Sequence, residues 1–197
     1  MNRPGSIVFR QGAGRLSLDF LRTLRYRGDA DEVEELRTPR ELLAWAEQCC
    51  ACAPAEGSRP VRQEDVNRAR EAREVLYDLL AGRLGGTGPV QVPEEVRARL
   101  NAWASAPTPV PHLDAAGRLR RQADDVVAAV LSLVARDVLD LVTSPAMGRV
   151  RRCGGPRCGA LFLDNSRPGS RRWCSMGACG NQEKKRARRE RTAPAFG

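Results

Sequence analysis

Four cysteines in the last quarter of the chain are spaced for metal binding. Cys153 pairs with Cys158 and Cys174 with Cys179, and each pair has four residues between its members. Four thiolates can surround one Zn²⁺ ion at Zn–S distances of about 2.3 Å, and a site of four sulfurs leaves no open position for a substrate. The pattern therefore predicts one structural zinc ion. Four thiolates also allow an iron–sulfur cluster, which we rank below zinc.

Three further cysteines, Cys49, Cys50 and Cys52, cluster in the first half of the chain. We interpret them as small apolar residues rather than as a redox or metal site. The odd total of seven cysteines, and the absence of an apolar export signal in residues 1–11, argue against a disulfide framework. His112 is the only histidine and lies beside a proline, so we expect no Ser/His/Asp or Cys/His catalytic pair and no enzyme.

The segments around the paired cysteines predict a small treble-clef-like module made of a turn, a β-hairpin and a helix. Residues 154–156 (Gly-Gly-Pro) supply the turn between the first two cysteines. Residues 161–163 and 171–173 are predicted as the two hairpin strands. The last helix is expected to start at the second cysteine pair. A module of this size buries little apolar surface, so zinc is expected to supply most of its folding free energy.

The distribution of charge also distinguishes the cysteine-rich last quarter from the rest of the chain. The whole chain has a net charge of +9. Residues 149–197 contain 13 basic and 3 acidic residues, whereas residues 1–148 contain 20 basic and 21 acidic residues. The excess of positive charge in the last quarter indicates an anionic partner, and nucleic acid is the first candidate. A solvated, solubilising tail is the alternative.

Residues 184–191 concentrate this charge in one predicted helix, with six cations in eight residues. At 100° per residue, Lys184, Arg188 and Arg191 share one face, and this spacing lets several cations follow successive phosphates. Arginine can also recognise guanine in the major groove. The residues that we predict to contact nucleic acid are Arg171, Arg172, Lys184, Lys185, Arg188, Arg189 and Arg191.

The fold class predicted for the whole chain is mainly α. Apolar periodicity predicts helices over residues 63–83 and 93–104, and a broadly apolar run predicts a long central helix over residues 117–143. Thr38, a proline and Glu41 form a capping box at the start of another helix. Residues 7–10 are predicted as a short edge strand. The longest strongly apolar run is too short to cross a membrane.

These patterns divide the chain into two domains and a tail. We expect a helical domain over residues 1–145, a zinc module with a basic helix over residues 149–192, and a disordered tail over residues 193–197. Residues 146–149 are expected to be a hinge between the two domains.

Both parts resemble known families. The stretches LFLDNS (161–166), SRRWCSM (170–176) and CGN (179–181) closely resemble the CGNR zinc finger, with Gln182 in place of the arginine that ends the motif. Upstream, LDF (18–20) followed by Thr23 and Leu24, and LLAW (42–45), are similar to the ABATE domain. The resemblance implies a bacterial stress-induced transcription regulator. It also implies zinc ligation by Cys153, Cys158, Cys174 and Cys179.

The combined expectation is a zinc-dependent DNA-binding transcription regulator of the cytoplasm that joins the nucleoid when bound to DNA. The N-terminal domain would sense a small-molecule or protein effector, for which no residues can be named. Two alternatives use the same features: an RNA-binding zinc protein, and a zinc-stabilised adaptor for protein interactions. The sequence shows no heptad seam, so the oligomeric state stays open.

Overall fold

The computed structural model describes residues 7–86 and 91–192, and for residues 187 and 190–192 it describes the backbone alone. The main elements of the described chain are the α-helices α1 (Leu16–Leu21), α2 (Pro39–Cys50), α3 (Gln63–Gly82), α4 (Glu94–Ser105), α5 (Val126–Thr143) and α6 (Asn181–Thr192). The short strands are β1 (Leu24–Arg25), β2 (Val33–Glu34), β3 (Cys52–Pro54), β4 (Val110–Leu113), β5 (Leu119–Ala123), β6 (Val150–Arg152) and β7 (Leu161–Leu163). A 3-10 helix, η1 (Pro145–Arg149), and a π-helix, η2 (Met176–Gly180), complete the order. The predicted mainly α fold with a C-terminal hairpin and helix is confirmed.

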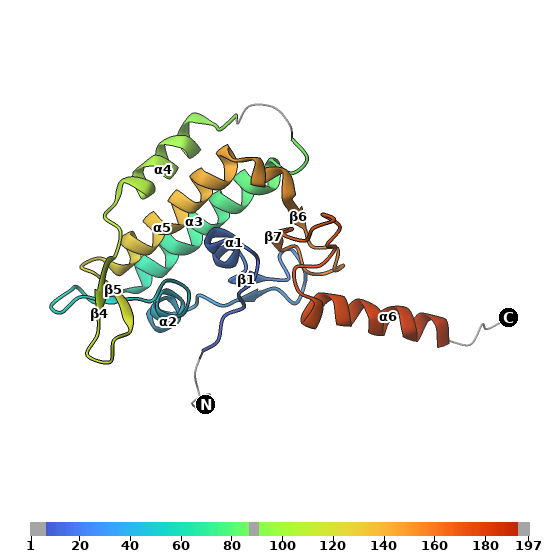
Figure 1. Ribbon diagram of the computed structural model, residues 1–197, viewed down its shortest axis with the longest axis horizontal. Coiled ribbons are helices and arrows are strands. Elements are labelled where there is room, and N and C mark those ends of the chain that lie inside the picture. The colour runs from blue at the N-terminus through green and yellow to red at the C-terminus, as the bar shows by residue number, and fades with distance from the viewer. Residues whose placement is uncertain (1–6, 87–90, 193–197) are drawn as a thin grey trace.

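The helix α5 lies at the centre of the N-terminal region. It packs against α1, α3 and α4, and Figure 1 shows α3 and α5 running side by side. Its buried residues, among them Val126, Leu131 and Ser132, lie on different sides and cover most of its circumference, as the apolar run predicts. Asp125 caps it by accepting a hydrogen bond of 2.9 Å from the Ala128 N–H. Neither α5 nor any other helix of the described residues is long and apolar enough to cross a membrane.

The helix predicted over residues 117–143 is wrong in its first part, which forms the strand β5. This strand pairs with β4 antiparallel and with β3 parallel, in the order β3-β5-β4. The Asp114 carboxylate accepts hydrogen bonds of 2.9 Å from the N–H groups of Ala116 and Arg118, and Gly117 adopts a φ of +71°. This turn starts a hairpin, so the helix begins only after it. With 18 residues, α5 is consequently shorter than α3, which has 20.

Residues 7–10 do not form the predicted strand. The amide side chain of Gln48 on α2 instead satisfies the backbone of Phe9. Its Oε1 accepts a hydrogen bond of 2.9 Å from the Phe9 N–H, and its Nε2 donates one of 2.8 Å to the Phe9 carbonyl. The Gln48 side chain thus forms hydrogen bonds with both backbone groups of Phe9 that could otherwise pair with a neighbouring strand. The side chain of Phe9 is buried.

The capping box predicted for α2 is confirmed. The hydroxyl of Thr38 accepts from the Glu41 N–H at 3.4 Å, and the Glu41 carboxylate accepts from the Thr38 N–H at 2.9 Å. Pro39 occupies the first helical position, where its missing N–H is no loss. The helix ends at Cys50, and the C-cap residue Ala51 adopts a left-handed conformation with a φ of 51°.

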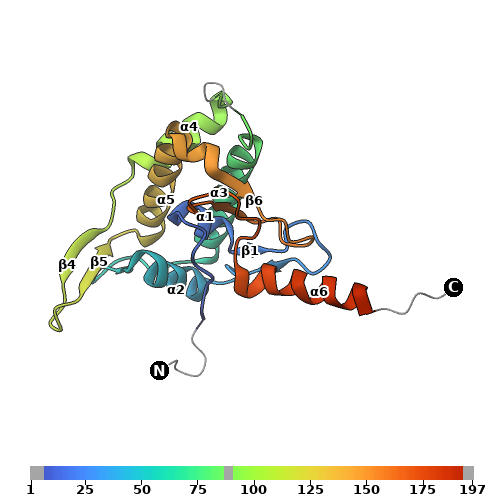
Figure 2. The ribbon, with the colours of Figure 1, turned by 45° about the vertical axis from the view of Figure 1, so that its right-hand side comes forward.

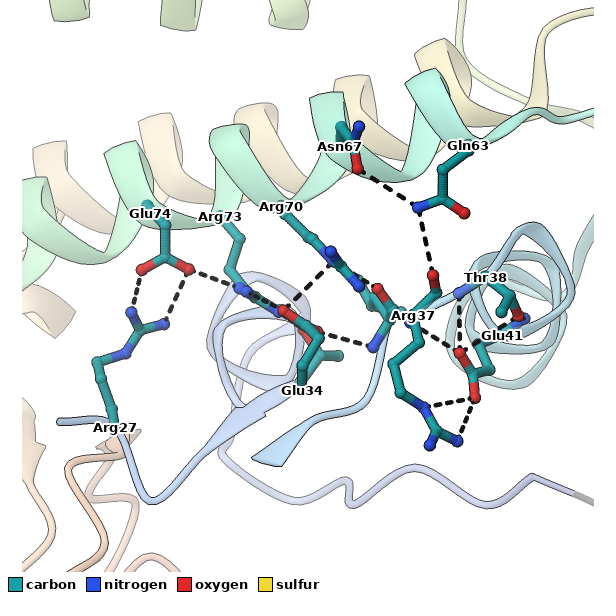
Figure 3. Close-up of polar contacts among 12 residues, drawn as sticks. Arg27, Glu34, Arg37, Thr38, Glu41, Gln63, Asn67, Arg70, Arg73 and Glu74 are labelled. Atoms are coloured by element: carbon teal, nitrogen blue, oxygen red, sulfur yellow. Dashed lines mark hydrogen bonds and ion pairs between the residues drawn. The ribbon is translucent and has the colours of Figure 1, made fainter. Parts of the chain in front are cut away.

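Ion pairs fasten the segment between α1 and α2 to the long helix α3 (Figure 3). Arg73 of α3 is 2% exposed and donates to both carboxylate oxygens of Glu34, at 2.8 and 2.6 Å, and to the Thr23 hydroxyl at 3.1 Å. Arg27 pairs with Glu74 on the same helix. A buried guanidinium needs such partners, because an unpaired charge in a core is strongly destabilising. The network fixes the segment that reaches the cysteine-rich module.

The C-terminal module shares its core with the N-terminal region. Phe162 of β7 is fully buried and belongs to the same apolar cluster as the helices. The next residue, Leu163, donates its N–H to the Ala13 carbonyl at 2.7 Å. Residues 146–149, expected to be a hinge, lie in η1, and Met147 there is buried. The link between the two parts is therefore a packed connection.

Candidate metal centre and nucleic-acid interface

The sulfur atoms of the four paired cysteines converge on one point. All four lie within 4.8 Å of one another, with 3.6 Å between Cys158 and Cys174 and 3.7 Å between Cys174 and Cys179. In a tetrahedral site with Zn–S distances of about 2.3 Å, neighbouring sulfurs lie about 3.8 Å apart. Three of the cysteines are buried, and Cys158 is half-buried. The donor set and its spacing therefore fit a structural zinc ion.

A tight turn brings the first two cysteines together. The Cys158 N–H donates to the Gly155 carbonyl at 3.0 Å, and the Cys153 N–H donates to the Ala160 carbonyl at 2.8 Å. A Cβ atom on Gly155 would lie 3.3 Å from the Cβ atoms of Cys158 and Cys179. Only a residue without a side chain fits this position without displacing a cysteine.

The hairpin of the module differs from the prediction in one strand. β7 pairs antiparallel with β6, the strand before the first cysteine, and residues 171–173 are not a strand. The Gly154 N–H donates to the Arg172 carbonyl at 2.8 Å, and the Arg171 N–H donates to the Asp164 carboxylate at 3.0 Å. The Arg172 carbonyl and the Arg171 N–H are thus already hydrogen-bonded, and they do not pair with a neighbouring strand.

Asp164 organises the loop that leads to the second cysteine pair. It is fully buried and accepts hydrogen bonds from the hydroxyl and N–H of Ser166, at 2.6 and 3.0 Å, besides the Arg171 N–H. Donation from the Ser166 hydroxyl and from these backbone groups lowers the pKa of Asp164. The carboxylate therefore stays charged and binds both ends of the loop, at Ser166 and at Arg171.

The second cysteine pair is tied to the first and to the start of the last helix. The Cys174 N–H points at the Cys153 sulfur at 3.3 Å, a contact that favours a thiolate there. The Ser175 hydroxyl accepts from the Ala178 N–H at 3.3 Å and starts η2, which contains Cys179. α6 continues from η2 directly. The position of the basic helix is thus set by the cysteine cluster.

Arg171 and Arg172, which we predict to contact nucleic acid, precede the second cysteine pair and make different contacts. Arg171 turns into the module: it donates to the Trp173 carbonyl at 2.8 Å and to the Cys174 carbonyl, and its guanidinium lies 4.8 Å from the Phe162 ring centre. Arg172 is exposed, with its guanidinium 5.1 Å from the Trp173 ring centre. Arg171 therefore supports the cysteine pair, and Arg172 lies at the surface.

Figures 1 and 2 show α6 extending from η2 away from the rest of the molecule. Near its start Arg186 pairs with Glu183 at 2.6 Å, and this hydrogen bond lowers the pKa of Glu183. The side chain of Arg191 lies outside the described residues. The other predicted contact residues on this helix are all exposed: Lys184, Lys185, Arg188 and Arg189.

Sequence reasoning did not single out the residues that join the module to the N-terminal region. Arg157, in the turn between the first two cysteines, donates to both carboxylate oxygens of Asp29, at 3.0 and 2.8 Å, and pairs with Asp31. The hydrogen bond from Arg157 lowers the pKa of Asp29. The only signal for this contact is an acidic cluster at residues 29–32 and a single arginine in the opposite turn.

A helical region packed onto a compact four-cysteine module defines a zinc-finger protein. The model of the ABATE family, described as "Putative stress-induced transcription regulator", matches residues 14–145, and the model of the CGNR zinc finger matches residues 149–192. The chain belongs to the ABATE family and carries a CGNR zinc finger, as the resemblance predicted. The four-cysteine cluster within this finger indicates one zinc site. Neither description names a catalytic activity, and a comparison with curated proteins finds no significant match.

Proposed function

We propose that the chain is a DNA-binding transcription regulator whose contact surface is assembled around zinc. The observation that carries this proposal is the exposed row of cations on α6, a helix that extends away from the body. Such a helix has no apolar face to bury, and its cations can neutralise successive phosphates. The description of the family as a stress-induced transcription regulator supports the same function.

In this proposal Cys153, Cys158, Cys174 and Cys179 hold one Zn²⁺ ion. Four thiolates leave the ion no open position, so it supplies folding free energy rather than catalysis. The cysteines fix η2 against the hairpin, and η2 fixes the direction of α6. DNA affinity should therefore depend on zinc even though the ion does not touch DNA.

The surface that contacts DNA comprises the exposed cations of α6 and of the segment before it. Their charges bind phosphates, and the arginines among them are also able to bind base edges. Arg171 acts indirectly, by holding the backbone at Trp173 and Cys174. The proposed contact residues are the exposed Arg172, Lys184, Lys185, Arg188 and Arg189, together with Arg191, whose side chain lies outside the described residues.

The N-terminal region is proposed to adjust this binding. Residues 1–145 form the sensing domain and residues 149–192 the DNA-binding domain, and the tail at residues 193–197 lies outside the described chain. A small-molecule or protein effector on the first domain would change DNA affinity through the packed connection. The proposed site of action is the nucleoid in the cytoplasm.

The test is selection of duplex DNA from a random pool by the zinc-loaded, full-length protein at about 150 mM salt. An enriched motif supports sequence-specific regulation. Retention without a motif is followed by competition between duplex DNA and RNA at equal salt, and preference for RNA overturns the proposal. Failure to retain duplex DNA also overturns it, and favours an adaptor for protein interactions. The zinc-free protein is the control and should retain no DNA.

A further inference from the structure

A groove lies where the N-terminal segment passes the start of the basic helix. Arg10 lines one side, and Asn181, Gln182, Lys184 and Lys185 of α6 line the other. The groove has a volume of about 530 Å³ and is broadly open to solvent. Residues from opposite ends of the chain therefore share one polar surface.

None of the three cations of this groove forms an ion pair within the described residues, although the charge of Arg10 also acts on the Glu35 carboxylate, which pairs with Arg25. No carboxylate of the described chain pairs with Arg10, Lys184 or Lys185, whereas Arg25 nearby pairs with Glu35 at 3.1 Å. Three cations around one hollow create a positive potential that attracts anions. The described lining of the groove contains three cations and no carboxylate, so the groove has the chemistry of an anion-binding site.

The backbone that carries Arg10 is held in place. Phe9 is buried and bonded at both its N–H and carbonyl to Gln48 of α2. On the other side, the Gln11 carbonyl accepts from Arg22 at 3.2 Å. Arg10 thus lines the groove from a backbone held on both sides, which reduces the conformational entropy that it loses on binding.

We infer that Arg10 of the N-terminal region and the first lysines of α6 form one composite groove for the phosphate backbone of DNA. This inference rests on the proposed function and extends its surface into the ABATE domain. A DNA strand fits better than a small anion, because the groove is open and continues into the cations along α6.

Gln182 provides a way to test this surface by gain of affinity. It stands at the fourth position of the CGNR motif, lines the groove and is exposed. Gln182→Arg would place a further cation beside Arg10 and the lysines. If a phosphate occupies the groove, this substitution should tighten DNA binding by about fivefold at 150 mM salt, as one added phosphate contact does.

The decisive experiment compares Arg10→Ala with Arg40→Ala in the zinc-loaded, full-length protein. Arg40 is exposed at the other end of α2 and has no ion pair within the described residues, so its variant loses the same charge away from the groove. Binding to a labelled duplex of mixed sequence is followed by fluorescence anisotropy from about 50 to 300 mM salt. Arg10→Ala should bind about fivefold more weakly at 150 mM and lower the log–log salt slope by about 0.9. Arg40→Ala should stay within about twofold of the wild type.

The outcomes separate this inference from the proposed function. If Arg10→Ala matches Arg40→Ala while Lys184→Ala and Lys185→Ala weaken binding, the composite groove is wrong and the DNA-binding function stands. If the wild type does not bind duplex DNA, both fail. If Arg10→Ala weakens RNA binding alone, the partner is RNA. If millimolar inorganic phosphate at constant ionic strength abolishes the difference, the groove is a site for free phosphate. Zinc content confirms that each variant is folded.

Discussion

The hydroxyl of Tyr77 on α3 donates a hydrogen bond of 2.8 Å to the carbonyl of Gly159 in the zinc module. The same hydroxyl accepts one of 2.7 Å from Arg152 of β6. Gly159 directly follows the first cysteine pair, and its φ of +63° suits a glycine packed against Arg27. Arg27 in turn lies 3.9 Å from the centre of the Tyr77 ring. One side chain thus connects the helical region to the turn that holds the metal.

Tyr77→Phe is expected to loosen this connection. It removes both hydrogen bonds and leaves the Gly159 carbonyl without its donor, so the free energy of unfolding should fall by about 1–3 kcal/mol. Urea unfolding of the zinc-loaded protein measures the loss. The control is Tyr26→Phe, since the Tyr26 hydroxyl has no hydrogen bond within the described residues. Equal losses for the two variants would contradict a role for the Tyr77 hydroxyl.

Cys174→Ser is expected to release zinc and unfold the C-terminal module while α1 to α5 persist. Structural zinc contributes about 10–16 kcal/mol in zinc-finger peptides, as much as a whole domain's stability of about 5–15 kcal/mol. Because Phe162 belongs to the shared core, the remaining helices should also melt at a lower temperature. Zinc analysis and circular dichroism measure both effects. Cys49→Ser should keep its zinc, and full zinc in Cys174→Ser would overturn the ligand assignment.

The features that could be predicted from sequence depend on short spacings. The two members of each cysteine pair are five residues apart, and Thr38 and Glu41 of the capping box are three residues apart. Their chemistry therefore appears in the sequence itself. The parallel pairing of Cys52 with Arg121 joins segments that are far apart in the chain. A prediction from local apolar periodicity does not include such a contact, and it therefore extended the helix α5 through the residues that form β5.

The composite groove and the Tyr77 contact could not be predicted for the same reason. Tyr77 and Gly159 are 82 residues apart, and Arg10 meets α6 across most of the chain length. The strand expected at residues 171–173 failed for a different reason. Specific hydrogen bonds hold these residues outside a sheet, above all the one from the Arg171 N–H to the buried Asp164 carboxylate.

Stability should decrease in acid partly through Asp65 at the start of α3. Hydrogen bonding to Arg59 lowers the pKa of Asp65 to about 2, below its value of about 3.9 in an unfolded chain. The carboxylate therefore stabilises the fold fully above about pH 4, and this contribution is lost as the pH falls towards 2. The difference in unfolding free energy between the wild type and Asp65→Asn should shrink over that range.

Denaturant titrations from pH 2 to 6 measure this difference. Acid releases zinc from both proteins alike, so only the difference between them is informative. Asp78→Asn is the control, because Asp78 is exposed on the same helix and has no ion pair within the described residues. It should leave the free energy of unfolding unchanged. A constant difference for Asp65→Asn across the whole range would contradict the assignment.

Replacing four of the exposed cations of α6 by alanine should weaken duplex binding and flatten its salt dependence. Each phosphate contact contributes about 0.9 to the log–log slope, so loss of four contacts lowers it by about 3–4 units. Alanine has the highest helix propensity, so the helix itself should persist. Anisotropy titrations at several salt concentrations measure the slope. The replaced residues are Lys184, Lys185, Arg188 and Arg189.

A charge-preserving variant separates phosphate binding from base recognition on α6. Lys184→Arg and Lys185→Arg combined with Arg188→Lys and Arg189→Lys keep every charge but change which positions can form paired hydrogen bonds. If these residues contact only phosphates, the slope and the selected sequence should both stay unchanged. If Arg188 or Arg189 recognises guanine, the slope should stay while preference for the selected sequence falls by about 1–3 kcal/mol per base pair. A slope that is unchanged in the alanine variant would remove α6 from the interface altogether.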